Sequence, residues 1–399
     1  MATYVLIEGV YDTLDLFSEE IRISLEEKDH RCIILHYDRM DKDLKQLLGA
    51  RIDAVITFNN LAYNLGESEG QNLWDALNTR YVNILMDHPF HYHRQLSGMP
   101  GCSEIFCIDK NHVDYVKRYY PHINVVSFLP HAGCVHAITD LSTKKRGNRT
   151  ESVYNSTSTN RDIDILYAGN LSRVLIEQLI PDFSQFPEID GAAFSQDVLS
   201  RLINEPDITT EDAILDRLHD LNVPLDSIDD ELRFLNGFRF LDGFATSYYR
   251  ELAVRIPADN GLHVSILGLG WEQCEWTDHD NITLLGKVNA GEVLPYMMRS
   301  HIVLNTLTWF KSGAHDRIFN GLLCGAEVVS DSSAYLRDIT ERQPQKSHGL
   351  HLFDLQDIAS LSSILEDILK DPLDPNEQRL CSDWVSSEHS WSARMEEIL

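Results

Sequence analysis

Residues 301–336 carry the side chains best placed to hold an anion. Two apolar runs in this block predict strands buried on both faces of a sheet, and a helix is expected between them, ending at Gly325. The start of the expected helix carries basic and imidazole side chains, which are Lys311, His315 and Arg317. In a parallel α/β sheet, helix N-termini and basic side chains beyond the carboxyl ends of strands bind phosphate. The block therefore predicts a phosphate site.

The same block resembles the C-terminal signature of GT-B glycosyltransferases, in particular the CgeB-like (spore-maturation type) group, related to glycosyltransferase families 1 and 4. That group has an Asn at the end of a strand and then the pattern His-x-Arg-x-Phe-x-x-Leu-x-x-Gly. The matching positions here are Asn305, His315, Arg317, Phe319, Leu322 or Leu323, and Gly325. Residues 164–171 and 284–305 resemble the earlier strands of such a domain. The resemblance implies an α/β fold with two Rossmann-like domains that face each other across a cleft.

The resemblance also implies an activity. We expect a glycosyltransferase of the hexosyltransferase type that moves a sugar from a nucleoside diphosphate donor, such as a UDP-sugar, to a hydroxyl group of a glycan or protein. No metal and no other cofactor is expected, because helix amides and Lys or Arg can neutralise the leaving diphosphate.

The chain departs from the GT-B pattern at one point. Many of these enzymes carry two glutamates eight positions apart across this helix, and Ser312 and Asn320 stand there instead. The amide of Asn320 can still pair with ribose hydroxyls, but it carries no charge. A catalytically silent nucleotide-sugar-binding protein or scaffold of the same fold is therefore the alternative, and an epimerase is a third possibility.

The donor contacts are expected on the second domain. Arg317 would hold a phosphate through its bidentate fork, and His315 would donate to a phosphate or a sugar hydroxyl. The alternatives are an ion pair between Arg317 and Asp316, and a helix-capping role for His315. The expected phosphate-binding set is Arg317, His315, Lys311, Gly169, Asn170 and Asn305, and the expected nucleoside-binding set is Lys287, Val288, Asn320 and Gly268.

A general base is expected on the first domain. An apolar run at 82–86 is followed directly by Asp87, His88, His91 and His93, so these side chains should face the cleft. Either Asp87 or His88 could take the proton of the acceptor hydroxyl. Asp12, after the first predicted strand, is a second candidate, and His131 is expected at the floor between the domains. A zinc site and a structural role in capping backbone groups are the alternatives for the histidines.

The spacing of apolar runs predicts the elements that position these residues. Strands are expected at 4–7, 32–36, 54–58, 82–86, 104–108 and 124–130, with helices between several of them, which indicates a parallel sheet. The predicted organisation is an acceptor domain at 1–137, a linker or mobile loop at 138–162, a nucleotide-sugar-binding domain at 163–380 with a helical insert at 172–255, and a C-terminal helix at 381–399. The resemblance places that last helix back on the first domain.

Composition narrows the function further. The 399 residues suffice for two domains, and the 34 basic and 62 acidic residues leave a net charge of −28. This field repels nucleic acid, which we do not expect as a partner. The first residues lack the features of a signal peptide and no apolar run is long enough to span a membrane, so the expected location is cytoplasmic.

Overall fold

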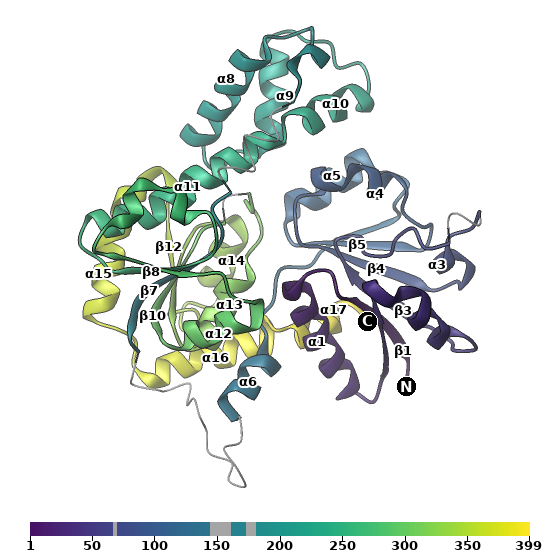
Figure 1. Cartoon of the computed structure of the whole chain (residues 1–399), viewed down its shortest axis with the longest axis horizontal. Helices are drawn as coiled ribbons and strands as arrows, with labels where there is room; N and C mark the ends of the chain where they lie inside the picture. The colour runs from purple at the N-terminus through teal and green to yellow at the C-terminus, as the bar shows by residue number, and fades with distance from the viewer. Residues whose placement is uncertain (67–69, 144–160, 173–180, 308) are drawn as a thin grey trace.

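The computed structural model describes residues 1–66, 70–143, 161–172, 181–307 and 309–399. The described chain forms two six-stranded parallel sheets with helices around them (Figure 1). The first sheet has the order β2-β1-β3-β4-β5-β6 and the second has the order β12-β11-β10-β7-β8-β9. The prediction of an α/β fold with two Rossmann-like halves is confirmed.

The first sheet is built from the N-terminal apolar runs. Its strands are β1 (Thr3–Glu8), β2 (Arg31–His36), β3 (Ala54–Phe58), β4 (Arg80–Leu85), β5 (Ser103–Cys107) and β6 (Val125–Phe128). The helices of this domain are α1 (Asp12–Glu26), α2 (Met40–Asp43), α3 (Leu73–Ala76), α4 (His93–Ser97) and α5 (Lys110–Tyr119). Every residue of β3 is buried, because helices and loops cover both faces of the sheet. The loops after β1, β2, β3 and β4 therefore emerge together at one edge.

The second sheet holds the block that carries the phosphate prediction. Its strands are β7 (Ile163–Ala168), β8 (Val264–Leu267), β9 (Ile282–Gly286), β10 (Ser300–Asn305), β11 (Glu327–Asp331) and β12 (Leu350–Phe353). Its helices are α12 (Ala290–Met298), α13 (Asp316–Leu323), α14 (Ala334–Arg342) and α15 (Leu361–Lys370). Helix α13 connects the neighbouring parallel strands β10 and β11, so its N-terminus lies at the carboxyl edge of the sheet.

Among the described residues, four helices between β7 and β8 form the insert. They are α8 (Gly191–Asn204), α9 (Thr210–Asp220), α10 (Ile228–Phe238) and α11 (Phe240–Asp259), of which α8, α9 and α10 stand at the top of Figure 1. Side chains of Asp190, Thr209 and Ser227 cap the first three of them. Their apolar faces share one core with the first domain, in which Phe194 and Phe238 belong to the same cluster as Phe90 and Tyr115. The insert therefore joins the two domains on one side of the cleft.

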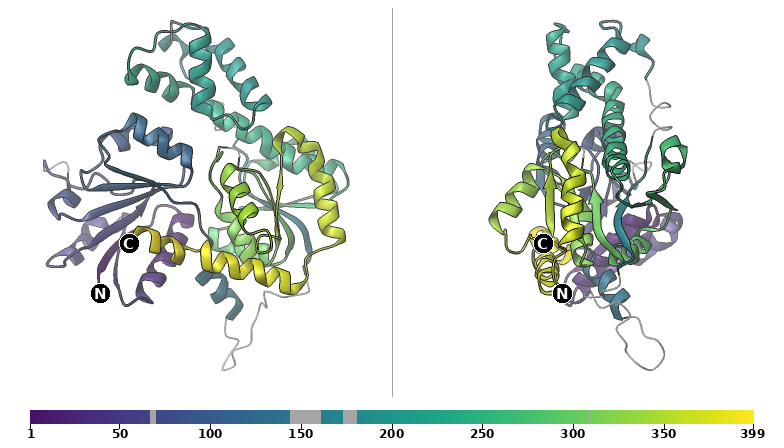
Figure 2. Two further views of the ribbon diagram at one scale, coloured as in Figure 1. Left: turned by 180° about the vertical axis from the view of Figure 1, so that it is seen from behind. Right: turned by 90° about the vertical axis from the view of Figure 1, so that its left-hand side faces the viewer.

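The C-terminal segment joins the domains on another side. Two helices, α16 (Pro375–Glu388) and α17 (Trp391–Ile398), stand where a single C-terminal helix was predicted at 381–399. The chain turns at His389, and the Ser390 side chain caps α17. This turn lets α16 pack on α13 while α17 packs on α1, where the rings of Trp391 and Phe17 lie 5.1 Å apart. Figure 2 shows this yellow segment crossing from the second domain to the first.

Part of the predicted linker is a helix. Helix α6 (Val135–Thr143) covers its first residues, while residues 144–160 lie outside the described part. The buried Glu20 carboxylate explains the helix start, because it accepts hydrogen bonds from the backbone N–H groups of His136 and Ala137 at 3.0 and 2.7 Å. No helix among the described residues is long and apolar enough to cross a membrane.

Candidate functional site

Two cavities lie between the domains, and they meet at the N-terminus of α13. The C-domain cavity, of about 250 Å³, is lined by loops of the second sheet and by α12, α13 and α1. The N-domain cavity, of about 660 Å³, is lined mainly by the loops after β1 to β4. Thr13, Asp316 and Arg317 line both cavities. These three residues therefore mark the boundary at which a group could pass from one ligand to another.

Arg317 lies in the groove between the domains, as the phosphate prediction requires. Its guanidinium donates to Asn305 Oδ1 at 3.3 Å and to His315 Nε2 at 3.2 Å. Both acceptors are neutral, and in the described ranges Arg317 forms no ion pair with Asp316 or another carboxylate. Burial, together with the nearby Arg250, lowers the pKa of Arg317, but a guanidinium stays protonated at neutral pH. Its charge therefore has no salt bridge among the described residues, and the nearby Asp316 acts on it only through an attraction that raises its pKa.

Asn305 and His315 hold this guanidinium in place. Asn305 is fully buried, donates to Ser330 Oγ at 3.0 Å, and accepts from His315 Nδ1 at 3.0 Å. Because His315 Nε2 accepts from Arg317, the ring is neutral with its proton on Nδ1, and burial lowers its pKa well below the usual value. Asn305, expected at the phosphate, lines neither cavity, and His315 lines the N-domain cavity instead of the C-domain cavity.

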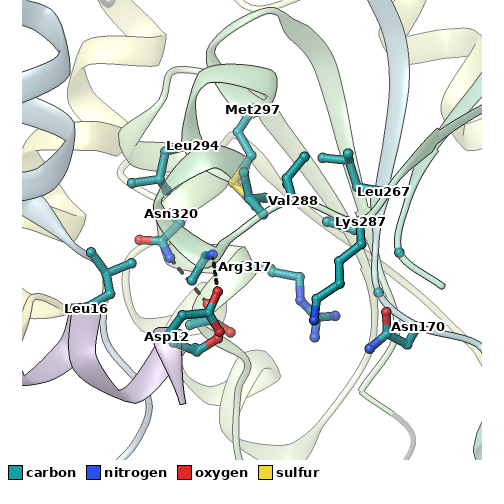
Figure 3. A pocket seen from close by; sticks show the side chains of 17 residues that line it. Asp12, Leu16, Asn170, Leu267, Lys287, Val288, Leu294, Met297, Arg317 and Asn320 are labelled. Carbon is teal, nitrogen blue, oxygen red and sulfur yellow. Dashed lines mark hydrogen bonds between the residues drawn. The ribbon is translucent and has the colours of Figure 1, made fainter. Parts of the chain in front are cut away.

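Lys287 supplies a second cation to the C-domain cavity. It follows β9, its side chain is exposed, and it has no hydrogen bond or ion pair within the described part of the chain. Figure 3 shows Lys287 and Arg317 pointing into the same region of the cavity, beside Asn170. Val288 lines the wall next to them. Two cations in one cavity, without a salt bridge among the described residues, make a suitable site for a diphosphate.

The floor of the C-domain cavity is backbone. Gly268 has a φ of +145°, and a Cβ there would come within 2.2 Å of the Gly169 carbonyl oxygen. Asn170 fixes the adjacent turn, because its Oδ1 accepts from the backbone N–H of Leu269 at 2.9 Å. The predicted residues Gly169, Asn170 and Gly268 are thus brought together, and a ligand can approach the main chain closely there.

Lys311 is not at this site. Its Nζ donates to the carbonyl oxygen of Pro206 in the insert, and it lines a separate small cavity with Asp207, Asp331 and Asp354. The reason is the docking of its loop, since the neighbouring Ser312 N–H donates to Asp109 Oδ2 of the first domain at 2.6 Å. The structure therefore does not bring Lys311 together with the other residues of the expected phosphate site.

Asp12 and Asn320 connect the domains across the C-domain cavity. Asp12 Oδ2 accepts from the N–H of Ala290 at the start of α12, at 2.8 Å. Asn320 Oδ1 accepts from Cys134 N–H at 2.8 Å, and its Nδ2 donates to Asp316 at 3.4 Å. Figure 3 shows both side chains at the edge of the cavity. Asp12 therefore lines the C-domain cavity and not the N-domain cavity, and both ends of the Asn320 amide are engaged.

Asp87 lines the N-domain cavity. Its Oδ2 accepts from Asn59 Nδ2 at 2.9 Å and from the Tyr92 hydroxyl at 2.7 Å. These two bonds orient the carboxylate at the carboxyl end of β4. Its position is suited to a proton acceptor for a ligand in this cavity.

His88 does not face the cleft. It is 4% exposed, its Nδ1 accepts from Phe90 N–H at 3.2 Å, and its Nε2 pairs with Glu211 of α9 at 3.2 Å. Burial lowers its pKa well below the usual value. The structure does not bring His88 into the cleft with the other predicted residues, because the ring lies against the insert and does not line either cavity.

The other histidines of this segment also turn to separate partners. His93 Nδ1 lies 3.0 Å from the Tyr120 hydroxyl, and the ring of His91 stacks on Phe90. In the part of the chain that the structure describes, no group of three His, Cys, Asp or Glu residues could hold a metal ion. The arrangement of 87–93 thus gives no support to the zinc alternative.

Comparisons with known proteins agree with this geometry. Residues 250–399 match the family model described as glycosyl transferase-like. The whole chain superposes on a sucrose-phosphate synthase from Thermosynechococcus elongatus with a TM-score of 0.54 and 9% identity, covering 100% of this chain and 97% of that one. It superposes on AviGT4, a glycosyltransferase involved in avilamycin A biosynthesis, with a TM-score of 0.50 and 11% identity, covering 100% and 96%.

The chain has the GT-B glycosyltransferase fold. A third GT-B structure, an alpha-glucosyltransferase in complex with UDP and a 13-mer DNA, has a TM-score of 0.50 and 12% identity, covering 100% of this chain and 98% of that one. No curated protein sequence matches the chain. At these identities the likeness concerns the GT-B fold, and membership of the CgeB-like group stays a prediction.

The sequence reasoning missed several residues of this GT-B cleft. Asp316 is the first residue of α13 and lines both cavities. Polar and aromatic side chains of the first domain also line the N-domain cavity, among them Tyr11, Tyr37, Asn59, Asn60 and Tyr92. Ligands bind beyond the carboxyl ends of parallel strands, which is why Asp87 was predicted after β4. The same reasoning applies to the loops after β1, β2 and β3, so most of these cavity residues could have been predicted from the sequence.

Proposed function

We propose that the protein is a metal-independent glycosyltransferase that moves a hexosyl group from a nucleoside diphosphate sugar to a hydroxyl group. The observation that carries this proposal is the guanidinium of Arg317, which has no salt bridge in the described structure and stands where the two cavities meet. A cation at such a boundary stabilises charge that develops on a leaving diphosphate.

The donor would occupy the C-domain cavity. Its diphosphate would lie between Arg317 and Lys287, above the backbone of Gly169 and Gly268, with the base toward Val288. At an effective dielectric constant of about 20, one unit charge at about 4 Å contributes roughly 4 kcal/mol of attraction. Two such cations balance the two negative charges of the diphosphate in the donor and stabilise the third that develops as the bond breaks, which is why the proposal includes no metal.

The acceptor would enter from the N-domain cavity. Its hydroxyl oxygen forms a bond to the anomeric carbon while the bond from that carbon to the diphosphate oxygen breaks. The electron pair stays on the diphosphate, beside Arg317, and the hydroxyl proton passes to Asp87. The two hydrogen bonds to Oδ2 of Asp87 leave Oδ1 to take this proton.

A nucleotide-sugar sensor of the same fold is the second candidate, and the absence of glutamates at positions 312 and 320 favours it. Incubation with sugars of UDP, GDP and dTDP, read by chromatography, separates the possibilities. Release of nucleotide supports a transferase, tight binding without release supports a sensor, and an altered sugar still attached to nucleotide supports an epimerase. A thermal-shift screen identifies the base, because a ligand at 100 times its dissociation constant adds about 2.7 kcal/mol of stability.

A further inference from the structure

We propose that the N-domain cavity binds a neutral saccharide, which makes a carbohydrate hydroxyl the acceptor. The inference rests on the proposed function and names its acceptor class. The observations that support it are the side chains on the loops after four adjacent strands, which together line this cavity.

The cavity lies across the carboxyl ends of neighbouring strands. Because the sheet order begins β2-β1-β3-β4, the loops after these strands stand side by side. They contribute Tyr37 after β2, Tyr11 after β1, residues 59–64 after β3, and the segment with Asp87 and Tyr92 after β4. A Cβ on Gly9 would lie 3.5 Å from the Tyr37 backbone nitrogen, so the first two loops are in close contact.

Two tyrosines are exposed at this cavity. Tyr11 and Tyr37 are 59% and 55% exposed, although large aromatic side chains on this chain are mostly buried. An aromatic ring offers a flat apolar face with a negative quadrupole, and the C–H face of a pyranose is flat, apolar and slightly positive. The hydroxyl at the edge of each ring remains free to meet the sugar hydroxyls.

Amide side chains supply the remaining polar groups. Asn59, Asn60, Asn64 and Gln95 line the cavity, and an amide presents a donor and an acceptor in one plane, which suits vicinal hydroxyls. Asn60 is 3% exposed, and its Nδ2 is buried without a hydrogen-bond partner in the described structure. The wall therefore holds a spare donor that a hydroxyl-rich ligand can use.

The loop after β3 has a left-handed backbone. Asn59, Asn60 and Ala62 have φ angles of 46°, 65° and 58°, a conformation that asparagine adopts readily but that costs energy at Ala62. Asn83 holds the loop, because its Nδ2 donates to Asn60 Oδ1 at 2.8 Å and its Oδ1 accepts from Asn60 N–H at 2.9 Å. Strain held in place in this way marks a loop shaped for a ligand.

The charges of the lining argue against other acceptors. Its cation is Arg317, at the boundary with the donor, while Asp87 and Asp316 are acidic and His315 is neutral. An anionic acceptor would meet the carboxylates of Asp87 and Asp316, whereas Arg317 stands at the boundary with the donor. An alkyl alcohol would leave the amides and tyrosine hydroxyls without partners, at a cost for each buried polar group.

Saccharide binding can be measured without any donor. We would record saturation-transfer NMR spectra of the full chain with neutral di- and trisaccharides at millimolar concentration. We expect Tyr37→Ala and Tyr11→Ala each to weaken binding roughly tenfold, because a stacking contact is lost, and the Phe variants to keep it. Tyr248→Ala is the matched control, since this tyrosine is 41% exposed on α11, away from both cavities.

The outcomes separate the inference from the proposed function. Binding that depends on the two rings supports the inference even if no nucleotide sugar is consumed, a result that would refute only the transferase. Absence of saccharide binding, or binding unchanged in both alanine variants, overturns the inference. Nucleotide release that yields only a glycosylated alkyl alcohol or peptide also overturns it, while leaving the transferase intact.

Discussion

Replacing Arg317 tests the link between the unpaired guanidinium and catalysis. Arg317→Ala removes the cation at the boundary of the two cavities and leaves Lys287 in the donor cavity. Arg317→Lys keeps a positive charge but not the bidentate fork. The neighbours Asn305 and His315 lose one donor each, and His315 Nε2 then faces the cavity, so we expect the fold to survive.

The size of the effect follows from the contacts. A hydrogen bond between charged groups contributes about 1.5–3 kcal/mol, and if this contribution is made in the transition state, its loss slows the reaction by roughly 10- to 150-fold. Lys at this position should restore part of that loss, because the point charge still attracts the diphosphate. Donor affinity should fall less than turnover, because the charge on the diphosphate grows as the glycosidic bond breaks.

The assay is release of nucleoside diphosphate from the donor found in the screen, with the melting temperature of each variant measured alongside. Arg342→Ala is the control, because Arg342 is an exposed arginine of α14 that pairs with Asp338. Turnover by Arg317→Ala at the parental rate, in a folded protein, would show that no diphosphate rests against this side chain. If the melting temperature of Arg317→Ala fell below the assay temperature, the loss of activity would point to a structural role only.

Three further predictions follow from the structure. Lys287→Ala should raise the donor KM roughly tenfold with a smaller change in kcat, measured by the same assay, because it removes one exposed charge. Gly268→Ala should cost about 3 kcal/mol in urea unfolding, because its Cβ would meet the Gly169 carbonyl, whereas Gly291→Ala, with open space around it, should not. Burial lowers the pKa of His131 to about 4 in the folded protein, against about 6.5 unfolded, so the unfolded chain takes up this proton first as pH falls. Its contribution to stability is complete above pH 6.5 and declines by about 2 kcal/mol at pH 5, a pH dependence that urea titrations of His131→Gln should lack.

The six strands of the first sheet could be predicted because each is a short apolar run with a clear boundary. Burial on both faces makes such runs continuous, and the intervening polar stretches mark the crossovers. The break between α16 and α17 could not be predicted from periodicity. It exists because the chain must cross from α13 of one domain to α1 of the other, which is a tertiary requirement.

The candidate site was predictable where position along a strand decides the outcome. Arg317, Gly169 and Gly268 follow strands of the second sheet and reach the cavity as expected. Lys311 does not, because its loop docks on Asp109, which lies about 200 residues earlier in the chain. The direction of a loop side chain depends on such remote contacts, and nothing in the local pattern reveals them.

The absence of glutamate at position 320 does not leave α13 without a carboxylate. Asp316 lies one turn earlier, at the first position of the helix, where the helix dipole stabilises an anion, and it lines both cavities. A glutamate at 320 would face Asp316 at i,i+4 spacing and repel it, whereas the amide of Asn320 donates to it and also ties α13 to Cys134 of the first domain. The carboxylate of Asp316 thus stands one helical turn before position 320, next to Arg317 and at the boundary between the cavities. A hydroxyl of a bound donor would meet Asp316 there, so Asp316→Asn should weaken an active transferase but not a sensor that depends on the two cations alone.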